Sequence, residues 1–304
     1  MRRSAASLLR CPRLSGWLAA VALVLGASPA WGQQSPRPAT APRPAPPRSV
    51  TRVAENQPAV PPSAGRDESG TAASGHPLEP AVELARRAAG RLQEVRDYTC
   101  VLVKRERIDG ELTPYESLFL KIRHEPFSVY IHCLGPTKPK GQEAIYVAGR
   151  NNNQVLAHST GLKKLAGTLT LEPTSARMME GNLYPLTNIG ILNMTNRLLT
   201  RETEEMAFGE CTVNYYQGAK VDGRPCTCVE IVHPVPRKNF KFHRTRVFYD
   251  NEWQFPVRTE NCGWPARVGD LPPVMEEYTY QQVRLNPGLT DLDFDTRNPS
   301  YGYE

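Results

Sequence analysis

The feature that most constrains the fold is a long series of short segments whose side chains alternate in character, each ended by Gly, Pro or Asn. Side chains alternate between two faces along a β-strand, so this pattern predicts strands. Asp222-Gly223 is a two-residue turn of the kind that closes a hairpin between neighbouring strands. We therefore predict an antiparallel meander. The expected strands are residues 98–106, 116–123, 127–133, 145–148, 154–158, 168–171, 213–220, 226–233, 245–249, 255–260 and 277–285.

Two regions have helical rather than alternating patterns. Residues 81–96 carry apolar side chains at helical spacing, and residues 175–205 form a second helical region. We expect the polar side chains near the end of that region to face water. They are Arg201, Glu202, Glu204 and Glu205. About ten strands with two helical regions predict an α+β fold: a large curved antiparallel sheet, or half-open barrel, with helices against its concave face.

The N-terminal residues have the layout of a secretory signal. A basic start is followed by an apolar run over residues 14–27 and by small residues that end at Gly32. We predict export to the periplasm or cell envelope, with residues 1–32 cleaved; an uncleaved anchor is the alternative. Residues 33–76 contain nine prolines and no aromatic residue, which predicts a disordered Pro-rich tether. Residues 77–304 are the expected domain.

The charge distribution and the apolar content of the chain each exclude one class of protein. The chain has 37 Lys+Arg and 31 Asp+Glu, and removing the nine basic and three acidic residues before position 77 leaves 28 of each. The expected domain is therefore neutral and has no nucleic-acid footprint. A single short apolar run excludes a polytopic membrane protein, and any membrane contact is expected to be peripheral.

Three stretches resemble a known family. Residues 118–129 (LFLKIRHEPFSV) combine a strand, a basic-Pro turn and a second strand, and residues 142–150 (QEAIYVAGR) give a short strand with a Gly-containing turn. Residues 278–286 (YTYQQVRLN), with Leu289 and Phe294, form a closing strand and a C-terminal hook. The order of these elements resembles the LolA-like periplasmic lipoprotein carriers. The chain also resembles a bacterial family of exported domains of unknown function.

This resemblance implies the half-barrel fold and a groove for lipid acyl chains or lipoprotein lipid moieties. The sequence departs from the carriers in its tether, in its six cysteines after Cys11, and in Gly149-Arg150, where a carrier usually has Asp-Gly. The first two departures favour a protein that stays in one place. We therefore expect this chain to share the fold of the carriers but not their transport activity.

The cysteines leave their pairing open. An even number in an exported protein permits disulfides, and no Cys-x-x-Cys motif occurs. Cys226 and Cys228, near His233 or His243, would form half of a metal site; small buried residues or disulfides are the preferred interpretation. We predict no metal and no cofactor. The six are Cys100, Cys133, Cys211, Cys226, Cys228 and Cys262.

The sequence also lacks the motifs of common catalytic centres. Cys133 with His132 or His124 resembles a thiol nucleophile with its base. Neighbouring strand residues point to opposite faces, however, so His132 cannot readily deprotonate Cys133. An EF-hand beginning at Asp291 would need Gly at its sixth position, where Thr296 stands. We predict no catalytic residue and no enzyme.

Two functions stay open. The first is a non-catalytic exported binding protein with an apolar groove for lipid acyl chains or lipoprotein lipid moieties. The alternative is an envelope interaction or stress-sensor domain whose groove is filled and whose partners, such as envelope proteins, bind outside. The residues expected to line the groove are Leu118, Leu120, Ile122, Phe127, Val129, Ile131, Ile145 and Val147.

Overall fold

The computed structural model describes residues 75–136, 140–160 and 167–303, which belong to one compact unit. The predicted signal segment 1–32 and nearly all of the predicted tether 33–76 lie outside these residues. The helices are α1 (Glu79–Gln93), α2 (Ala176–Met179) and α3 (Ile191–Glu205). The strands are β1 (Asp97–Ile108), β2 (Glu111–Leu112), β3 (Glu116–Arg123), β4 (Ser128–Gly135), β5 (Glu143–Val147), β6 (Val155–His158), β7 (Thr168–Leu171), β8 (Thr212–Val221), β9 (Arg224–Val232), β10 (Arg244–Asp250), β11 (Pro256–Cys262) and β12 (Val274–Leu285).

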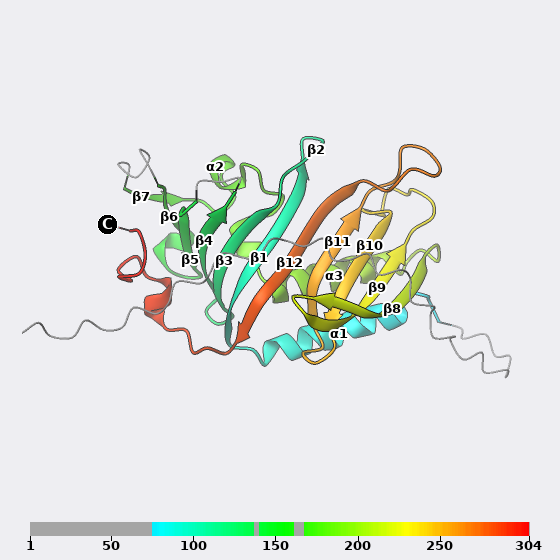
Figure 1. The fold of residues 1–304 in the computed structure, drawn as a ribbon, viewed down its shortest axis with the longest axis horizontal. Coiled ribbons are helices and arrows are strands. Elements are labelled where there is room, and N and C mark those ends of the chain that lie inside the picture. The colour runs from blue at the N-terminus through cyan, green and yellow to red at the C-terminus, as the bar shows by residue number, and fades with distance from the viewer. Residues whose placement is uncertain (1–74, 137–139, 161–166, 304) are drawn as a thin grey trace, which may run out of the picture. The chain divides into compact units, whose positions relative to one another are not determined.

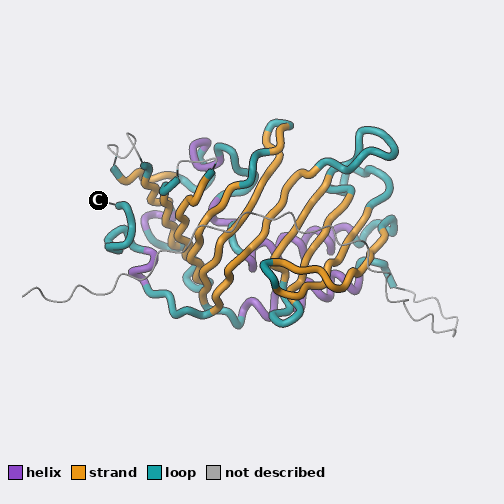
Figure 2. Tube along the Cα trace, in the orientation of Figure 1, coloured by secondary structure: helices purple, strands orange, loops and turns teal. Residues whose placement is uncertain are grey.

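The described strands form one antiparallel sheet. Its order is β7-β6-β5-β4-β3-β1-β12-β11-β10-β9-β8, and β2 pairs with β1 beside this path. The path begins at β7 and ends at β8, so the sheet is open. Helices α1 and α3 lie on one face (Figures 1 and 2). The predicted fold class, α+β with a large curved antiparallel sheet and helices against its concave face, is confirmed.

Local sequence explains two of the turns between neighbouring strands. β8 and β9 are joined at Asp222-Gly223, where φ is 52° and 79°, as a type I′ hairpin turn requires. The turn Asp109-Gly110, with φ of 50° and 87°, ends β1 in the same way. Both turns favour Asp-Gly because Gly adopts positive φ without steric cost.

The helical regions differ from their predictions in detail. The first helix was expected over residues 81–96 and covers Glu79–Gln93. The second region, expected over residues 175–205, contains α2, a short 3-10 turn at Leu186–Asn188, and α3. No helix in the described part of the chain is both long enough and apolar enough to span a membrane.

The main core lies between the sheet and the helices. We call the sheet face that packs against α1 and α3 the inner face, and the opposite face the outer face. Helix α1 contributes Val82 and Leu92 to this core, and α3 contributes Ile191, Met194 and Leu198. The three side chains of α3 recur every three or four residues, which places them on one side of that helix.

The C-terminal segment 286–303 covers part of the outer face. The Tyr301 ring stacks on the Tyr130 ring at 3.9 Å between centroids. The Glu143 carboxylate accepts hydrogen bonds from the Tyr130 hydroxyl at 2.7 Å and from the Gly302 N–H at 2.6 Å. This packing fastens the segment over β4 and β5.

Two aspartates that a calcium loop would have used also fasten this segment. Asp293 lies 2.7 Å from the Lys121 ammonium, and Asp291 lies 2.8 Å from the Arg123 guanidinium. These lysine and arginine partners hold the pKa of both carboxyl groups below their usual value, although partial burial of Asp293 acts in the opposite direction and is its largest single influence.

Candidate functional site

The structure divides the eight predicted groove residues between the two faces. Six of them contribute to the inner core or pack against it. Ile145 and Val147 lie on the outer face with Tyr130, because β5 pairs with β4 in the register Tyr130↔Ile145. The prediction had grouped all eight by apolar character, without the register that sets their face. The six inner residues are Leu118, Leu120, Ile122, Phe127, Val129 and Ile131.

These six residues form an apolar floor that the protein itself covers. The exposed fractions of Leu120, Ile122 and Val129 are 0%, 1% and 0%. Phe127 and Ile131 are partly buried at its margin. The centre of the floor is therefore part of the packed core.

Two tyrosine hydroxyls of the sheet fix the start of α3 on this floor. The Ile191 N–H donates to the Tyr98 hydroxyl at 2.7 Å, and the Gly190 N–H donates to the Tyr280 hydroxyl at 3.1 Å. The first N–H groups of a helix have no partner within the helix, so these bonds satisfy buried donors. Gly190 has φ of 111°, and a Cβ there would lie 3.0 Å from the Tyr98 oxygen and 3.2 Å from Ile122. A glycine at this position lets α3 approach the sheet closely.

We expect Tyr98→Phe to lower the free energy of unfolding by about 1–3 kcal/mol, because the Ile191 N–H is left buried without an acceptor. Urea denaturation of the full chain measures this change. Tyr215→Phe is the matched control, since Tyr215 is 37% exposed and should change stability little. Equal stability of Tyr98→Phe and wild type would show that this bond does not hold α3.

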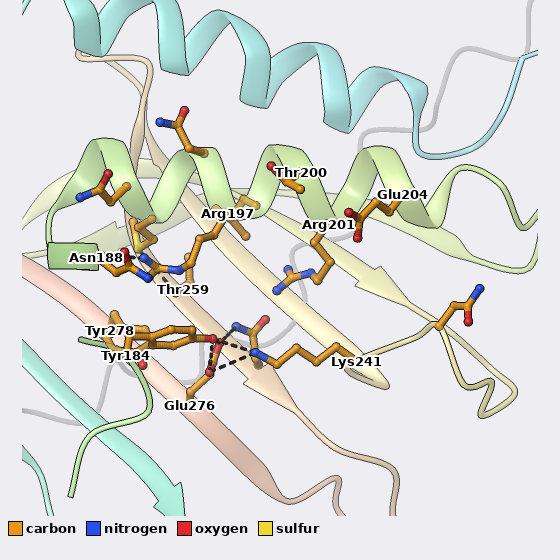
Figure 3. Close-up of a pocket in the computed structure, with 16 residues that line it drawn as sticks. Tyr184, Asn188, Arg197, Thr200, Arg201, Glu204, Lys241, Thr259, Glu276 and Tyr278 are labelled. Carbon is orange, nitrogen blue, oxygen red and sulfur yellow. Dashed lines mark hydrogen bonds and ion pairs between the residues drawn. The ribbon is translucent and has the colours of Figure 1, made fainter. Parts of the chain in front are cut away.

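Beside the covered floor, the inner face opens into a polar cleft of about 470 Å³, which we call the α3 cleft (Figure 3). Its walls come from α3, the segment before it, the β9–β10 loop, β11 and β12. The lining residues are Tyr184, Asn188, Asn193, Met194, Asn196, Arg197, Leu198, Thr200, Arg201, Glu204, Asn239, Lys241, Thr259, Asn261, Glu276 and Tyr278.

The sheet wall of the α3 cleft is organised around Glu276. Its carboxylate accepts a hydrogen bond from the Asn261 amide at 2.9 Å and one from the Tyr184 hydroxyl at 2.9 Å. The Tyr184 hydroxyl in turn accepts a hydrogen bond from the Lys241 ammonium at 2.7 Å. Burial, reinforced by Glu276, raises the pKa of Tyr184 above its usual value, so this hydroxyl stays protonated. Its proton can therefore be donated to Glu276.

Three cations complete the α3 cleft. Arg197 and Arg201 are one helical turn apart on α3, so they project from the same side of the helix. The Arg197 guanidinium lies 4.5 Å from the centre of the Tyr184 ring and donates to the Asn188 carbonyl at 2.6 Å. The Arg201 guanidinium lies 5.0 Å from the centre of the Phe242 ring. Aromatic contacts of this kind restrict where a long arginine can point.

A buried charged cluster lies on the inner face beyond the α3 cleft. Lys104, Glu106 and Glu116 have exposed fractions of 7%, 2% and 5%. The Lys104 ammonium lies 2.9 Å from Glu106 and 3.7 Å from Glu116. The Tyr278 hydroxyl donates to Glu106 as well, and connects this cluster to the cleft wall.

Residues 95–303 match the model of a family described as "Protein of unknown function (DUF1571)". This match includes every strand of the sheet, from β1 to β12. The chain belongs to the DUF1571 family. A search of curated proteins found no match.

Several solved structures are similar to this DUF1571 chain. One is a putative outer membrane lipoprotein-sorting protein domain from Vibrio parahaemolyticus. The sequence identity is 12%, the match covers 70% of this chain and 95% of that one, and the TM-score is 0.33. The Mycobacterium tuberculosis lipoprotein LppX has 13% identity, coverage of 71% and 100%, and a TM-score of 0.42. A LolA superfamily protein from Nitrosomonas europaea has 10% identity, coverage of 69% and 97%, and a TM-score of 0.29. Similarities at this level identify no ligand or partner.

The structure separates the candidate nucleophile of the DUF1571 domain from its base. Cys133 lies in the inner core, whereas the His132 ring is 3.3 Å from Glu143 on the outer face. Burial raises the pKa of Cys226 to about 11 and that of Cys228 to about 12, so neither is a ready thiolate. Cys100, Cys211, Cys226, Cys228 and Cys262 form no disulfide among the described residues.

The suggested half metal site is not assembled around these cysteines. His233 instead lies 3.1 Å from Glu205 of α3, and its ring stacks on Phe240 at 3.9 Å. No group of three or more His, Cys, Asp or Glu residues among residues 75–136, 140–160 and 167–303 is arranged to hold a metal ion.

Two glutamates of α3 correct the sequence prediction. Glu202 and Glu205 were expected to face water, and both are buried. Their side of α3 packs toward the protein, where Glu205 meets His233 and Arg201. The prediction took this side as the exposed one because it is charged.

Proposed function

We propose that this DUF1571 domain is a non-catalytic, exported binding domain of the cell envelope whose apolar floor is filled by its own helices. The observation that supports this proposal best is the burial of Leu120, Ile122 and Val129 within the main hydrophobic core, to which the helices also contribute. An acyl chain would have to displace packed side chains and break the hydrogen bonds that fix the start of α3. Partners would then bind at outer surfaces or in the α3 cleft.

The alternative, an acyl-chain site on the floor, makes a different prediction in a binding experiment. We expect the full chain to show no saturable uptake of a dansyl-labelled fatty acid, because a chain can gain about 0.8 kcal/mol per CH₂ only where open apolar space exists. Fluorescence titration measures this uptake. Native mass spectrometry of protein purified from its own envelope should likewise show no bound free fatty acid.

A floor variant distinguishes the two interpretations if uptake does occur. Ile131 is only partly buried on the floor, so Ile131→Gln should fold. Lys220→Gln, at an exposed position on β8, is the matched control. Saturable uptake that Ile131→Gln reduces and Lys220→Gln leaves intact would overturn the filled-floor proposal and support acyl-chain binding.

A further inference from the structure

The charges that line the α3 cleft are not balanced within it. Three cations, Arg197, Arg201 and Lys241, face two carboxylates, Glu204 and Glu276. Glu276 already accepts hydrogen bonds from the cleft wall, and Lys241 lies 3.9 Å from it. Arg201 also lies 3.9 Å from the buried Glu205, which does not line the cleft. Arg197 contacts the Tyr184 ring and the Asn188 carbonyl and forms no ion pair with a carboxylate in the described part of the chain, so its positive charge is left for a ligand.

The surroundings of Lys241 disfavour its charged form. Its pKa lies below the usual value, chiefly because of partial burial, and the charges of Arg201 and Arg197 lower it further against the opposing effect of Glu276. A bound anion would relieve this repulsion. The Lys241 side chain is also 55% exposed, so a ligand can reach its ammonium group.

The cations approach the same space from two directions. Figure 3 shows Arg201 pointing from α3 toward the region where Lys241 reaches Glu276 from the opposite side. Arg197 and Arg201 lie on aromatic rings, so their positions are partly set before any ligand binds. Donors that converge from different directions suit the tetrahedral oxygens of a phosphate better than one planar carboxylate.

Neutral polar groups surround these cations. Three asparagines, Asn188, Asn196 and Asn239, are exposed at the cleft, and Thr200 is exposed on α3 between the two arginines. Amides and hydroxyls both donate and accept hydrogen bonds, as the hydroxyl groups of a carbohydrate or glycerol require. A volume of about 470 Å³ matches a small molecule.

We propose that the α3 cleft binds a phosphate ester on a hydroxylated carrier, such as a sugar phosphate or a phosphoglycerol group. Arg197, Arg201 and Lys241 hold the phosphate, and the asparagines contact the carrier hydroxyls. This site goes beyond the proposed function and does not depend on the floor being filled.

Isothermal titration calorimetry of the full chain tests the site with glucose 1-phosphate, with glucose as the uncharged comparison. We expect the phosphate ester to bind and glucose not to bind, with an affinity that falls as salt concentration rises. Lys241→Gln and Arg197→Gln should each weaken binding by about tenfold or more, as expected for loss of a charge-assisted hydrogen bond. Lys220→Gln and Arg86→Gln, at exposed positions outside the cleft, should leave it unchanged.

Vesicles containing phosphatidylglycerol, compared with phosphatidylcholine vesicles, distinguish a lipid source of the phosphate from a soluble one. Binding to these anionic vesicles that Lys241→Gln weakens supports the site with a lipid headgroup as its ligand. Absence of binding to both glucose 1-phosphate and phosphatidylglycerol would overturn the proposal. Binding that is equal in wild type, Lys241→Gln and Arg197→Gln would overturn it as well.

Discussion

Lys104→Met is expected to lower the free energy of unfolding by about 3–5 kcal/mol, as breaking one side of a buried ion pair does. Lys104 is the cation for both Glu106 and Glu116, at 2.9 and 3.7 Å, and one oxygen of Glu116 has no hydrogen-bond partner. Methionine keeps much of the lysine stem, so the lost charge rather than a cavity should dominate. Urea denaturation of the full chain measures the difference.

Lys121→Met provides the matched control for this prediction. Lys121 pairs with Asp293 at a comparable 2.7 Å, but that pair is partly exposed. A pair that keeps contact with solvent should contribute less than the buried cluster does. If Lys104→Met and Lys121→Met were equally stable, the buried cluster would not require its lysine. Adding Glu106→Gln to Lys104→Met should recover part of the loss, because one uncompensated carboxylate is removed.

Glu202→Gln is expected to change how stability depends on pH. Burial raises the pKa of Glu202 to about 7 from an ordinary 4.5; Glu205 raises it further and Arg201 lowers it. The folded state therefore holds a proton that the unfolded state releases. This contribution is fully present below about pH 4.5 and is lost as pH rises through about 7.

Glutamine is uncharged at every pH, so the stability of Glu202→Gln should not fall as the pH rises through about 7. Between about pH 5 and pH 9, its stability relative to wild type should rise by roughly 3 kcal/mol. Denaturation midpoints measured across this range provide the test. Glu204→Gln is the control, because Glu204 is its exposed neighbour on α3. Parallel pH profiles for wild type and Glu202→Gln would show that Glu202 is not held in the protonated form.

The sheet could be predicted from sequence because its signals are local. Alternation predicted β3 and β4 near their observed limits, and Asp222-Gly223 predicted the hairpin between β8 and β9. Faces were harder to predict, because they depend on which residues pair across strands. Ile145 looked equivalent to Val129 in sequence, and only the pairing of Tyr130 with Ile145 places it on the other face.

The α3 cleft could not be predicted in the same way. Tyr184, Arg197, Lys241 and Glu276 come from four separate parts of the chain, and no short motif connects them. One local signal was present, since Arg197 and Arg201 are spaced by one helical turn. The charge of Glu202 gave a misleading signal, because a carboxyl group that is protonated in the fold appears in a sequence as a surface residue.

The pairing of β1 with β12 at the centre of the sheet bears on how the chain assembles. Tyr98 is paired with Leu285, so the first and last long strands of the sheet meet there. A ribosome or an export channel delivers β1 long before β12. During that interval one edge of β1 has no partner, and unpaired strand edges are sites of aggregation. The two halves of the sheet, built from hairpins between successive strands, can form early, whereas the seam between them requires the closure of a very long loop, which is slow. Protection of that edge until synthesis is complete is therefore a requirement of this strand order, independent of any ligand.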